Sequence, residues 1–296
     1  MRVSLVVNPR SRRGRRFGAA VRVQLIRMGV EPVAESAPGG PLDAIVVAGG
    51  DGTFARQISR AIELDVPIGL VPLGTFNDLA RTLAIPFDLG AACALIASGQ
   101  TRRIDVAAVN GVYYATEASL GISSRIAKLQ KTADKQRFGV GAIVLSALQA
   151  ARFARPFHAE IAYDGERASF KTVQLTVANS QRFGGFITVD DAAIDDGWLD
   201  LYAVDGEGFL PVIRVFSAML SHQGRFAKGV RTFRSTAFSV TTRRRHRITA
   251  DGEPAGTTPA RFEILPAALR VFAPSGRIRA SLATERNRSV PRAERI

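Results

Sequence analysis

The sequence predicts an α/β N-terminal domain with a parallel sheet, followed by a C-terminal antiparallel β-sandwich domain with helical insertions. Apolar strand-like runs alternate with helix-like runs up to about residue 104, and strand-like runs then follow one another with few helices between them. Glycine-rich turns also follow two of the early apolar runs. Strand–helix alternation is typical of a parallel sheet covered on both faces, and successive strands are typical of an antiparallel sheet.

The first domain is expected over residues 1–104. Its strands are continuous apolar runs, as expected for strands buried on both faces. Glycine turns at the carboxyl ends of such strands lie where open α/β sheets bind ligands. We expect strands at 3–7, 43–48 and 67–71, and helices at about 14–28, 53–64, 77–84 and 88–98.

The second domain is expected over residues 105–273, and the segment 274–296 is a tail that could also join the first domain. Two helical stretches, at about 123–154 and 209–223, interrupt its strands. This pattern is typical of a sandwich or barrel. We expect strands at 104–109, 112–119, 157–163, 168–178, 198–204, 232–241, 246–250, 261–265 and 269–273.

The composition is that of a globular protein with an excess of positive charge. Of the 296 residues, 46% are hydrophobic, and 40 Lys and Arg outnumber 26 Asp and Glu to give a net charge of +14. This charge implies attraction to an anionic partner, although a compositional bias of the genome towards Arg and Ala explains it equally well. The single cysteine excludes an intrachain disulfide and a cysteine metal cluster, and the three histidines lack metal-ligand spacing.

No apolar run reaches the roughly 18 residues that a membrane-spanning helix needs. We therefore expect a cytoplasmic protein that contacts a membrane only peripherally. The helix at 139–154 and the basic tail at 284–296 are candidates for contact with an anionic membrane surface, and each is also explained as an ordinary packed helix or solvated end. The basic residues show no aromatic interleaving, so nucleic acid is not an expected partner. The oligomeric state stays open, a homodimer included.

The first candidate ligand-binding turn is GGDGT at 49–53. Gly50 and Gly52 permit close approach of a phosphate to the backbone N–H groups. Thr53 is suited to cap the following helix or to bond a phosphate oxygen. Asp51 would repel phosphates unless it binds Mg²⁺, directly or through water. An ordinary Asp-Gly turn with a capping Thr is the alternative.

The second candidate turn is PLGTFND at 72–78. Thr75 and Asn77 are helix-capping residue types, and Asp78 falls in the first turn of the expected helix 77–84. A cap needs only one of these residues, so two such turns at one sheet edge indicate a nucleotide and metal site. A polar turn at 8–14 faces the same edge, and its arginines are suited to neutralise phosphates.

A fourth motif, Asp251-Gly252-Glu253, follows a late strand-like run. It places two carboxylates two residues apart at a turn. Alone, this pattern is a common hairpin signature.

Together these motifs resemble the diacylglycerol kinase catalytic family, which includes soluble bacterial lipid kinases and sphingoid-base kinases. GGDGT alone is shared with NAD kinases, whereas GGDGT followed by PLGTFND and a late DGE is specific. The matching segments cover nearly the whole chain in the family's order. They are NPRS (8–11), AGGDGT (48–53), PLGTFNDLAR (72–81), TRRID (101–105), VANSQRFGG (177–185), DDGWLDL (195–201) and DGE (251–253).

The resemblance implies a first domain like that of phosphofructokinases and NAD kinases, with ATP bound between it and the sandwich. The implied activity is ATP- and Mg²⁺-dependent phosphorylation of a lipid alcohol, with diacylglycerol as the first choice of substrate. Asp251 matches the general base, and Asp51, Asp78 and Glu253 match acids linked to the catalytic magnesium. A second, structural magnesium is implied at Ala193, Asp196 and Trp198. The candidate nucleotide-binding residues are Asn8, Ser11, Arg12, Ser36, Gly49, Gly50, Asp51, Gly52, Thr53, Gly74, Thr75 and Asn77.

The chain departs from the family pattern at two places near the nucleotide site. Arg12 follows Ser11 where the family usually has glycine, and the segment 31–42 lacks the helix usually found before GGDGT. Ser36 is the candidate there for a hydroxyl on the adenosine side. Every predicted catalytic acid is present, so activity is expected. A sphingoid base, monoacylglycerol or another lipid alcohol remains open as the substrate, as do an NAD kinase, whose family lacks the PLGTxND turn, and a non-catalytic lipid- or nucleotide-sensing module.

Overall fold

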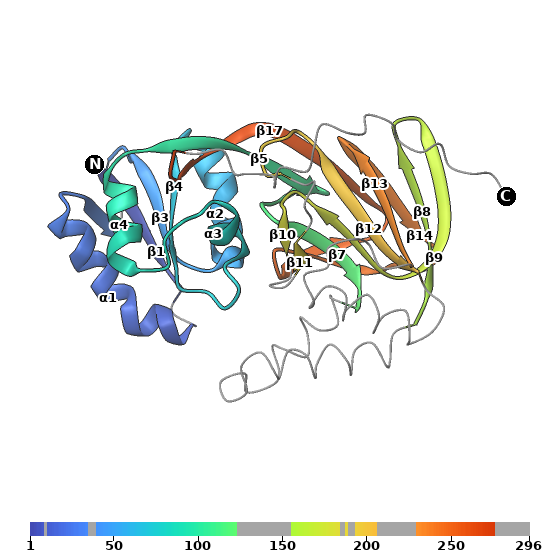
Figure 1. The fold of residues 1–296 in the computed structure, drawn as a ribbon, viewed down its shortest axis with the longest axis horizontal. Helices are drawn as coiled ribbons and strands as arrows, with labels where there is room; N and C mark the ends of the chain where they lie inside the picture. The colour runs from blue at the N-terminus through green and yellow to red at the C-terminus, as the bar shows by residue number, and fades with distance from the viewer. Residues whose placement is uncertain are drawn as a thin grey trace.

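The computed structural model of this chain describes residues 1–8, 11–34, 40–122, 155–183, 187–188, 193–205 and 229–275. Most of its helices and parallel strands lie in one half of the molecule, and antiparallel strands fill the other half (Figure 1). We call these halves the parallel part and the antiparallel part. The predicted fold class is confirmed. The helices expected near 123–154 and 209–223 and the tail from 284 lie outside the described residues.

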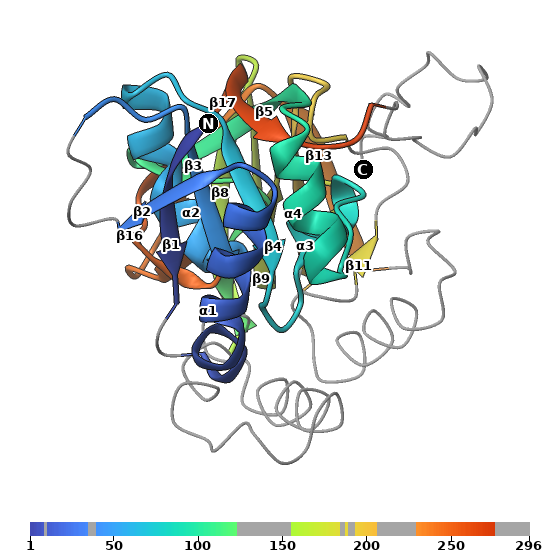
Figure 2. The same ribbon diagram turned by 90° about the vertical axis from the view of Figure 1, so that its left-hand side faces the viewer.

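The parallel part is a sheet covered by helices on both faces. In β3 (Ala44–Gly49), Ile45 and Val47 pack on one face with α2 (Asp51–Glu63), whereas Val46 and Ala48 pack on the other with α1 (Arg12–Arg27). This alternation follows from the two-residue period of a strand. Figure 2 shows α1 and α4 (Leu89–Ala97) in front of β3 and β4 (Ile68–Pro72), with α2 behind them. The other elements here are β1 (Arg2–Val7), β2 (Glu31–Ala34) and α3 (Asp78–Thr82).

Strand order places the glycine turns at one edge of this sheet. The parallel pairings run β2-β1-β3-β4, and β17 (Ala260–Phe272) adds a parallel pair at Val271 and Ile68. β3 ends at Gly49 and β4 ends at Pro72, and the two strands are neighbours with Gly49 opposite Pro72. The turns that follow them therefore start side by side. The short strand β2 was not predicted from the sequence.

The antiparallel part is built from strands that alternate buried and exposed side chains, as β14 (Ala237–Thr242) shows. Its core includes Tyr114, Phe170, Phe238 and Phe262. The two stretches expected as strands at 112–119 and 232–241 are each divided in two. The strands are β5 (Thr101–Val109), β6 (Val112–Tyr114), β7 (Glu117–Gly121), β8 (Phe157–Tyr163), β9 (Glu166–Ala178), β10 (Arg182–Phe183), β11 (Ile187–Thr188), β12 (Leu199–Asp205), β13 (Val230–Ser235), β14, β15 (Arg247–Ala250) and β16 (Glu253–Thr257).

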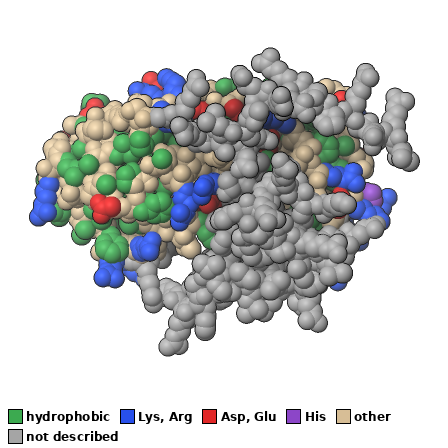
Figure 3. Space-filling view, in the orientation of Figure 1, with side chains coloured by type: hydrophobic (Ala, Val, Ile, Leu, Met, Phe, Trp, Pro, Cys, Tyr) green, Lys and Arg blue, Asp and Glu red, His purple; other side chains and the backbone are tan. Residues whose placement is uncertain are grey.

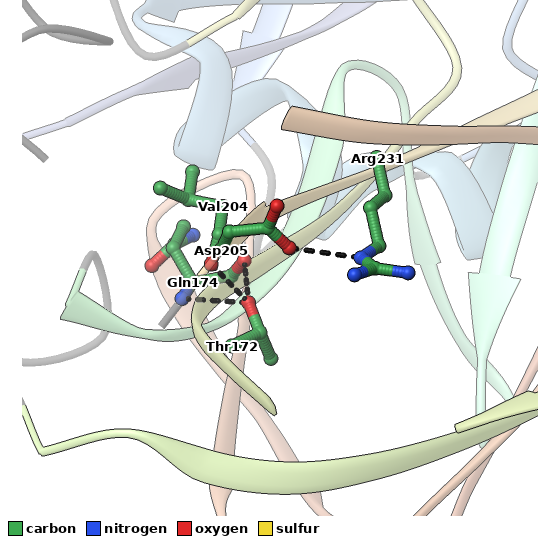
Figure 4. A network of polar contacts seen from close by, with 5 residues as sticks. All are labelled: Thr172, Gln174, Val204, Asp205 and Arg231. Atoms are coloured by element: carbon green, nitrogen blue, oxygen red, sulfur yellow. Dashed lines mark hydrogen bonds and ion pairs between the residues drawn. The ribbon is translucent and has the colours of Figure 1, made fainter. Parts of the chain in front are cut away.

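A bulge between β9 and β12 is closed by a buried threonine. The pairing register shifts between Val204 and Asp205. The Thr172 hydroxyl lies 2.7 Å from the carbonyl oxygens of both Gln174 and Val204, and it accepts a bond from the Gln174 N–H at 3.2 Å (Figure 4). Arg231 pairs with Asp205 at 2.8 Å beside it. The hydroxyl satisfies backbone groups that the bulge removes from the ladder.

β5 and β17 belong to both parts. They pair along most of their lengths and run along the top of the molecule from the antiparallel part to the parallel part (Figure 1). β17 was expected as two strands, at 261–265 and 269–273, but it is one strand with an irregularity between Leu265 and Leu269. Ala267 there adopts a positive φ of 51°, and its N–H donates to the buried Asp105 carboxylate at 2.7 Å. Asp105 thereby stabilises the bend that lets one strand serve both parts.

Candidate active site

The two glycine turns pack backbone against backbone. The Leu73 N–H donates to the Gly49 carbonyl at 2.8 Å. A Cβ on Gly74 would lie 2.5 Å from the Gly50 Cα, and a Cβ on Gly50 would lie 2.9 Å from the Gly74 Cα. Neither distance leaves room for a side chain. The glycines at these positions are therefore required by the contact between the turns.

Asn77 stabilises the second turn from within. It adopts a left-handed φ of 52° and is 2% exposed. Its Oδ1 accepts from the Gly74 N–H at 2.9 Å, and its Nδ2 donates to the Gly74 carbonyl at 3.0 Å. Asn77 precedes α3 but makes no side-chain cap bond to it, so its role is to fix the turn. Thr75 is exposed at the same turn.

Asp51 joins the two turns through the start of α3. Its carboxylate accepts from the N–H groups of Asp78 and Leu79, both at 3.1 Å. Burial raises the pKa of Asp51, and the bonds from the α3 backbone oppose that rise. Asp78 follows directly and is 5% exposed. Both acids predicted for the catalytic metal in the parallel part therefore lie at one place.

The turn after β1 meets the first of these turns. The Asn8 Nδ2 donates to Thr53 Oγ1 at 3.3 Å. Ser11 caps α1 by accepting from the Gly14 N–H at 2.7 Å. Of the two roles predicted for Thr53, the helix cap is excluded, because α2 begins at Asp51 and Gly50 occupies the cap position, and the bond to a phosphate oxygen stays a prediction. The side chain of Arg12 and the whole of Ser36 lie outside the described residues.

The late DGE motif forms the turn of the β15–β16 hairpin. Asp251 and Gly252 have φ values of 46° and 81°, which is the backbone that a two-residue hairpin turn needs. The Asp251 carboxylate accepts from the N–H groups of Ala115 at 2.7 Å, Thr116 at 3.0 Å and Glu117 at 3.1 Å, and also from the Thr116 hydroxyl. Burial raises the pKa of Asp251 to about 6 despite these bonds. A carboxylate in this range is suited to accept a proton near neutral pH.

The DGE turn lies against α2 of the parallel part. A Cβ on Gly52 would lie 3.0 Å from the Asp251 carbonyl oxygen and 3.4 Å from the Glu253 Cγ. Arg56, one helical turn further along α2, donates to Glu253 at 3.0 Å. Two motifs about 200 residues apart in the sequence therefore meet at the junction of the two parts. The view in Figure 3 shows basic and acidic side chains near the middle of the molecule, beside the residues drawn in grey.

Glu117 is a further acid of this junction that no motif revealed. It is partly buried, and its carbonyl accepts from the Asp251 N–H at 2.9 Å. Burial, together with the charges of Asp251 and Asp78, raises the pKa of Glu117 to about 8. The fully buried Tyr114 hydroxyl nearby has no hydrogen-bond partner among the described residues, and burial, together with the charges of Asp251 and Glu117, raises its pKa. The only signal in the sequence is an acid inside the apolar run that contains it.

Glu117→Gln is expected to stabilise the metal-free protein at pH 8 by on the order of 2 kcal/mol and to have little effect at pH 4.5. Below its unfolded pKa the carboxyl is neutral in both states. As pH rises towards 8, the unfolded chain loses the proton while the folded chain retains it, so wild-type stability falls relative to glutamine. Urea unfolding in EDTA at both pH values measures the difference. Glu160→Gln, at an exposed position on β8, is the control, and an equal effect of Glu117→Gln at the two pH values would contradict the expectation.

The junction suits a hard divalent cation. Its candidate ligands, Asp51, Asp78 and Glu253, offer only oxygen. Burial raises the pKa values of Asp51, Asp251 and Glu117, and neighbouring acids add to the rise for the last two, so a bound cation would stabilise the charged carboxylates. In the described part of the chain, no group of three or more acidic, His or Cys side chains is arranged to hold a metal ion. Mg²⁺ commonly takes one or two carboxylates and completes its shell with water and phosphate oxygens. The residues therefore fit magnesium bound together with a nucleotide.

The predicted structural magnesium site has an arginine beside it. Asp196 accepts from the Trp198 N–H at 3.0 Å and pairs with Arg234, which also pairs with Asp200 at 3.3 Å. Burial raises the pKa of Asp196 and the Arg234 charge opposes that rise. Ala193 lies in the same turn, which is anchored to Asp105 by the Gly197 N–H at 2.7 Å. The structural metal at this turn stays a prediction.

Comparison with known proteins identifies the class and then the family. The family model described as "Diacylglycerol kinase catalytic domain" matches residues 15–109. The family model described as "YegS C-terminal NAD kinase beta sandwich-like domain" matches residues 116–273, which is more than half of the chain. A diacylglycerol kinase catalytic domain followed by this sandwich domain defines a class of lipid kinases. The chain belongs to the diacylglycerol kinase catalytic-domain family, which is a lipid kinase family.

Individual relatives are distant but cover most of the chain. The chain is 28% identical over 236 residues to "Diacylglycerol kinase" of Bacillus subtilis (strain 168), covering 78% of each protein. It is 28% identical to "Uncharacterized protein sll0036" of Synechocystis over 78% of this chain, which is only 54% of that protein's length. A solved structure described as "a putative diacylglycerol kinase from Bacillus anthracis str. Sterne" superposes with a TM-score of 0.76 at 21% identity, covering 93% of this chain and 97% of that one. That likeness concerns the fold.

In the described residues, no helix is both long and apolar enough to cross a membrane.

Proposed function

We propose that this chain transfers the γ-phosphate of ATP, with Mg²⁺, to the hydroxyl of a lipid alcohol, and that diacylglycerol is its substrate. The observation that carries the proposal is the meeting of GGDGT, PLGTFND and DGE at one junction, with Asp51, Asp78, Asp251 and Glu253 around it. Phosphoryl transfer depends mainly on positioning and on neutralising charge. This junction offers backbone turns for phosphates on one side and a carboxylate base on the other.

The residues divide the work as follows. The glycine turns present backbone N–H groups to the phosphates, with Asn8, Ser11, Thr53 and Thr75 as polar neighbours. Asp51, Asp78 and Glu253 would hold the magnesium ion, which when bound neutralises phosphate charge. Asp251 accepts the proton of the lipid hydroxyl. The hydroxyl oxygen bonds to the γ-phosphorus, and the bond from that phosphorus to the ADP oxygen breaks. Backbone N–H groups fix the Asp251 carboxylate for this step.

A phosphate-transfer screen tests the proposal. Purified protein is incubated with γ-labelled ATP and diacylglycerol, monoacylglycerol, a sphingoid base or NAD, with Mg²⁺ or EDTA. Label is expected in diacylglycerol, only with Mg²⁺, and not with Asp51→Asn. A lipid substrate in a bilayer requires peripheral contact with the membrane, which we propose occurs at its cytoplasmic face. Presenting the lipids in anionic and in neutral vesicles tests this contact. Label in NAD would favour the soluble-dinucleotide reaction, and no label in any acceptor would favour a sensing module.

A further inference from the structure

Arg56 links α2 of the parallel part to the DGE turn of the antiparallel part. Its Nη1 donates to Glu253 Oε1 at 3.0 Å, across 197 residues of sequence. The two side chains are 53% and 38% exposed. Arg56 lies in none of the motifs that carry the family resemblance, so sequence reasoning gave it no role.

Arg56 and Gly52 share one face of α2, because residues four apart on a helix are neighbours. At Gly52 the helix approaches so closely that a Cβ would lie 3.4 Å from the Glu253 Cγ and Oε1. Gly52 thus leaves room for the DGE turn to approach α2. One helical turn later, the Arg56 guanidinium bonds to the Glu253 carboxylate. This face of α2 therefore contacts the backbone of the DGE turn at Asp251 and the side chain of Glu253.

Glu253 shares the junction with two other carboxylates. Asp51 heads the same helix, and Asp251 shares the hairpin turn. Like charges at a shared site repel one another when no cation is bound. A guanidinium bonded to Glu253 opposes this repulsion and restricts the long Glu253 side chain to fewer rotamers. Less conformational entropy is then lost when Glu253 binds the metal.

We propose that Arg56 is a positioning residue, which holds Glu253 at the junction before metal and nucleotide bind. The proposal rests on the assignment of Glu253 as a metal ligand in the proposed function. An exposed ion pair contributes little to folding, so the effect of Arg56 is expected in metal binding and not in stability. This separates a positioning role from a structural one.

The test compares Arg56→Met, Arg56→Lys and the control Arg60→Met. Arg60 lies four residues further along α2 and contacts Ser4 at 3.4 Å, so the control removes an equal charge from the same helix. Arg56→Met is expected to raise the Mg²⁺ concentration for half-maximal activity by about 3–10-fold with a smaller change in kcat. Arg56→Lys restores part of the loss, because it keeps the charge but not the planar fork. Arg60→Met behaves as wild type.

A second measurement is independent of turnover. Calorimetric titration of Mg²⁺ into protein saturated with a non-hydrolysable ATP analogue is expected to show the same weakening in Arg56→Met, with an unchanged unfolding midpoint. Unchanged or tighter Mg²⁺ binding would overturn the proposal, since tighter binding would mean that Arg56 competes with the metal for Glu253. A lowered unfolding midpoint with unchanged Mg²⁺ affinity would also overturn it. If the wild-type protein transfers no phosphate, the titration still decides the role of Arg56 separately from the proposed reaction.

Discussion

Asp251→Asn is expected to lower turnover by about 10²–10⁴-fold while nucleotide binding persists, because the amide cannot accept the substrate proton. The residue lies on the antiparallel part, across the junction from the glycine turns that are proposed to hold the nucleotide, and its carboxylate is bound by backbone N–H groups of residues 115–117. Single-turnover phosphate transfer and equilibrium binding of an ATP analogue measure the two effects separately. Turnover equal to wild type in the purified variant would remove Asp251 from the role of base.

The same change also disturbs the fold, and a control must separate the two consequences. An asparagine NH₂ group facing the N–H groups of Ala115, Thr116 or Glu117 would leave a buried donor unsatisfied, at a cost of about 1–3 kcal/mol. Thr116→Val removes only the hydroxyl bond to Asp251 and preserves the size of the side chain. It is expected to lose stability but to retain most turnover. Equal losses of turnover in both variants would indicate that Asp251 acts through structure.

Gly74→Ala is expected to destabilise the protein by about 1–3 kcal/mol or more and to abolish nucleotide binding. The added Cβ would lie 2.5 Å from both the Gly50 Cα and the Asn77 Oδ1. One obstacle is backbone, so the two turns must separate to admit it. Urea unfolding and binding of an ATP analogue measure the two losses.

Gly99→Ala is the matched control for this substitution. Gly99 has a positive φ of 72° and no atom within 4 Å of the added Cβ, so alanine there costs only the backbone strain of about 1–2 kcal/mol. Nucleotide binding should survive in this variant. If Gly74→Ala retained wild-type nucleotide affinity, close packing of the turns would not be required for the site.

The sequence was sufficient to predict elements whose burial is continuous or alternating. β3 and β4 are unbroken apolar runs, and the amphipathic face of α2 repeats at Phe54, Ile58 and Ala61. The bend in β17 was not predictable, because it depends on a bond from Ala267 to Asp105, 162 residues away. β2 has only four residues and too little pattern to separate it from a loop.

The candidate site also has features that the sequence predicts and features that it does not. The glycine turns and the DGE hairpin have local signatures, and the structure brings these motifs together. Three features have no local signature: the bonds of Asp51 to α3, the four donors around Asp251, and the pairing of Arg56 with Glu253. Glu117 belongs with them, since its raised pKa depends on burial and on two distant acids. Each arises from contacts between segments far apart in the chain.

The path of β17 has a consequence for how the protein is made. Phe272 packs in the core of the parallel part, and Val271 pairs with Ile68 of β4. During synthesis, the first hundred residues emerge long before this strand, so β4 has an open edge until β17 has left the ribosome. The parallel part, which is proposed to bind the nucleotide, is therefore completed by the last strand of the described residues. A protein truncated before residue 260 would lack this strand and keep an exposed, aggregation-prone sheet edge.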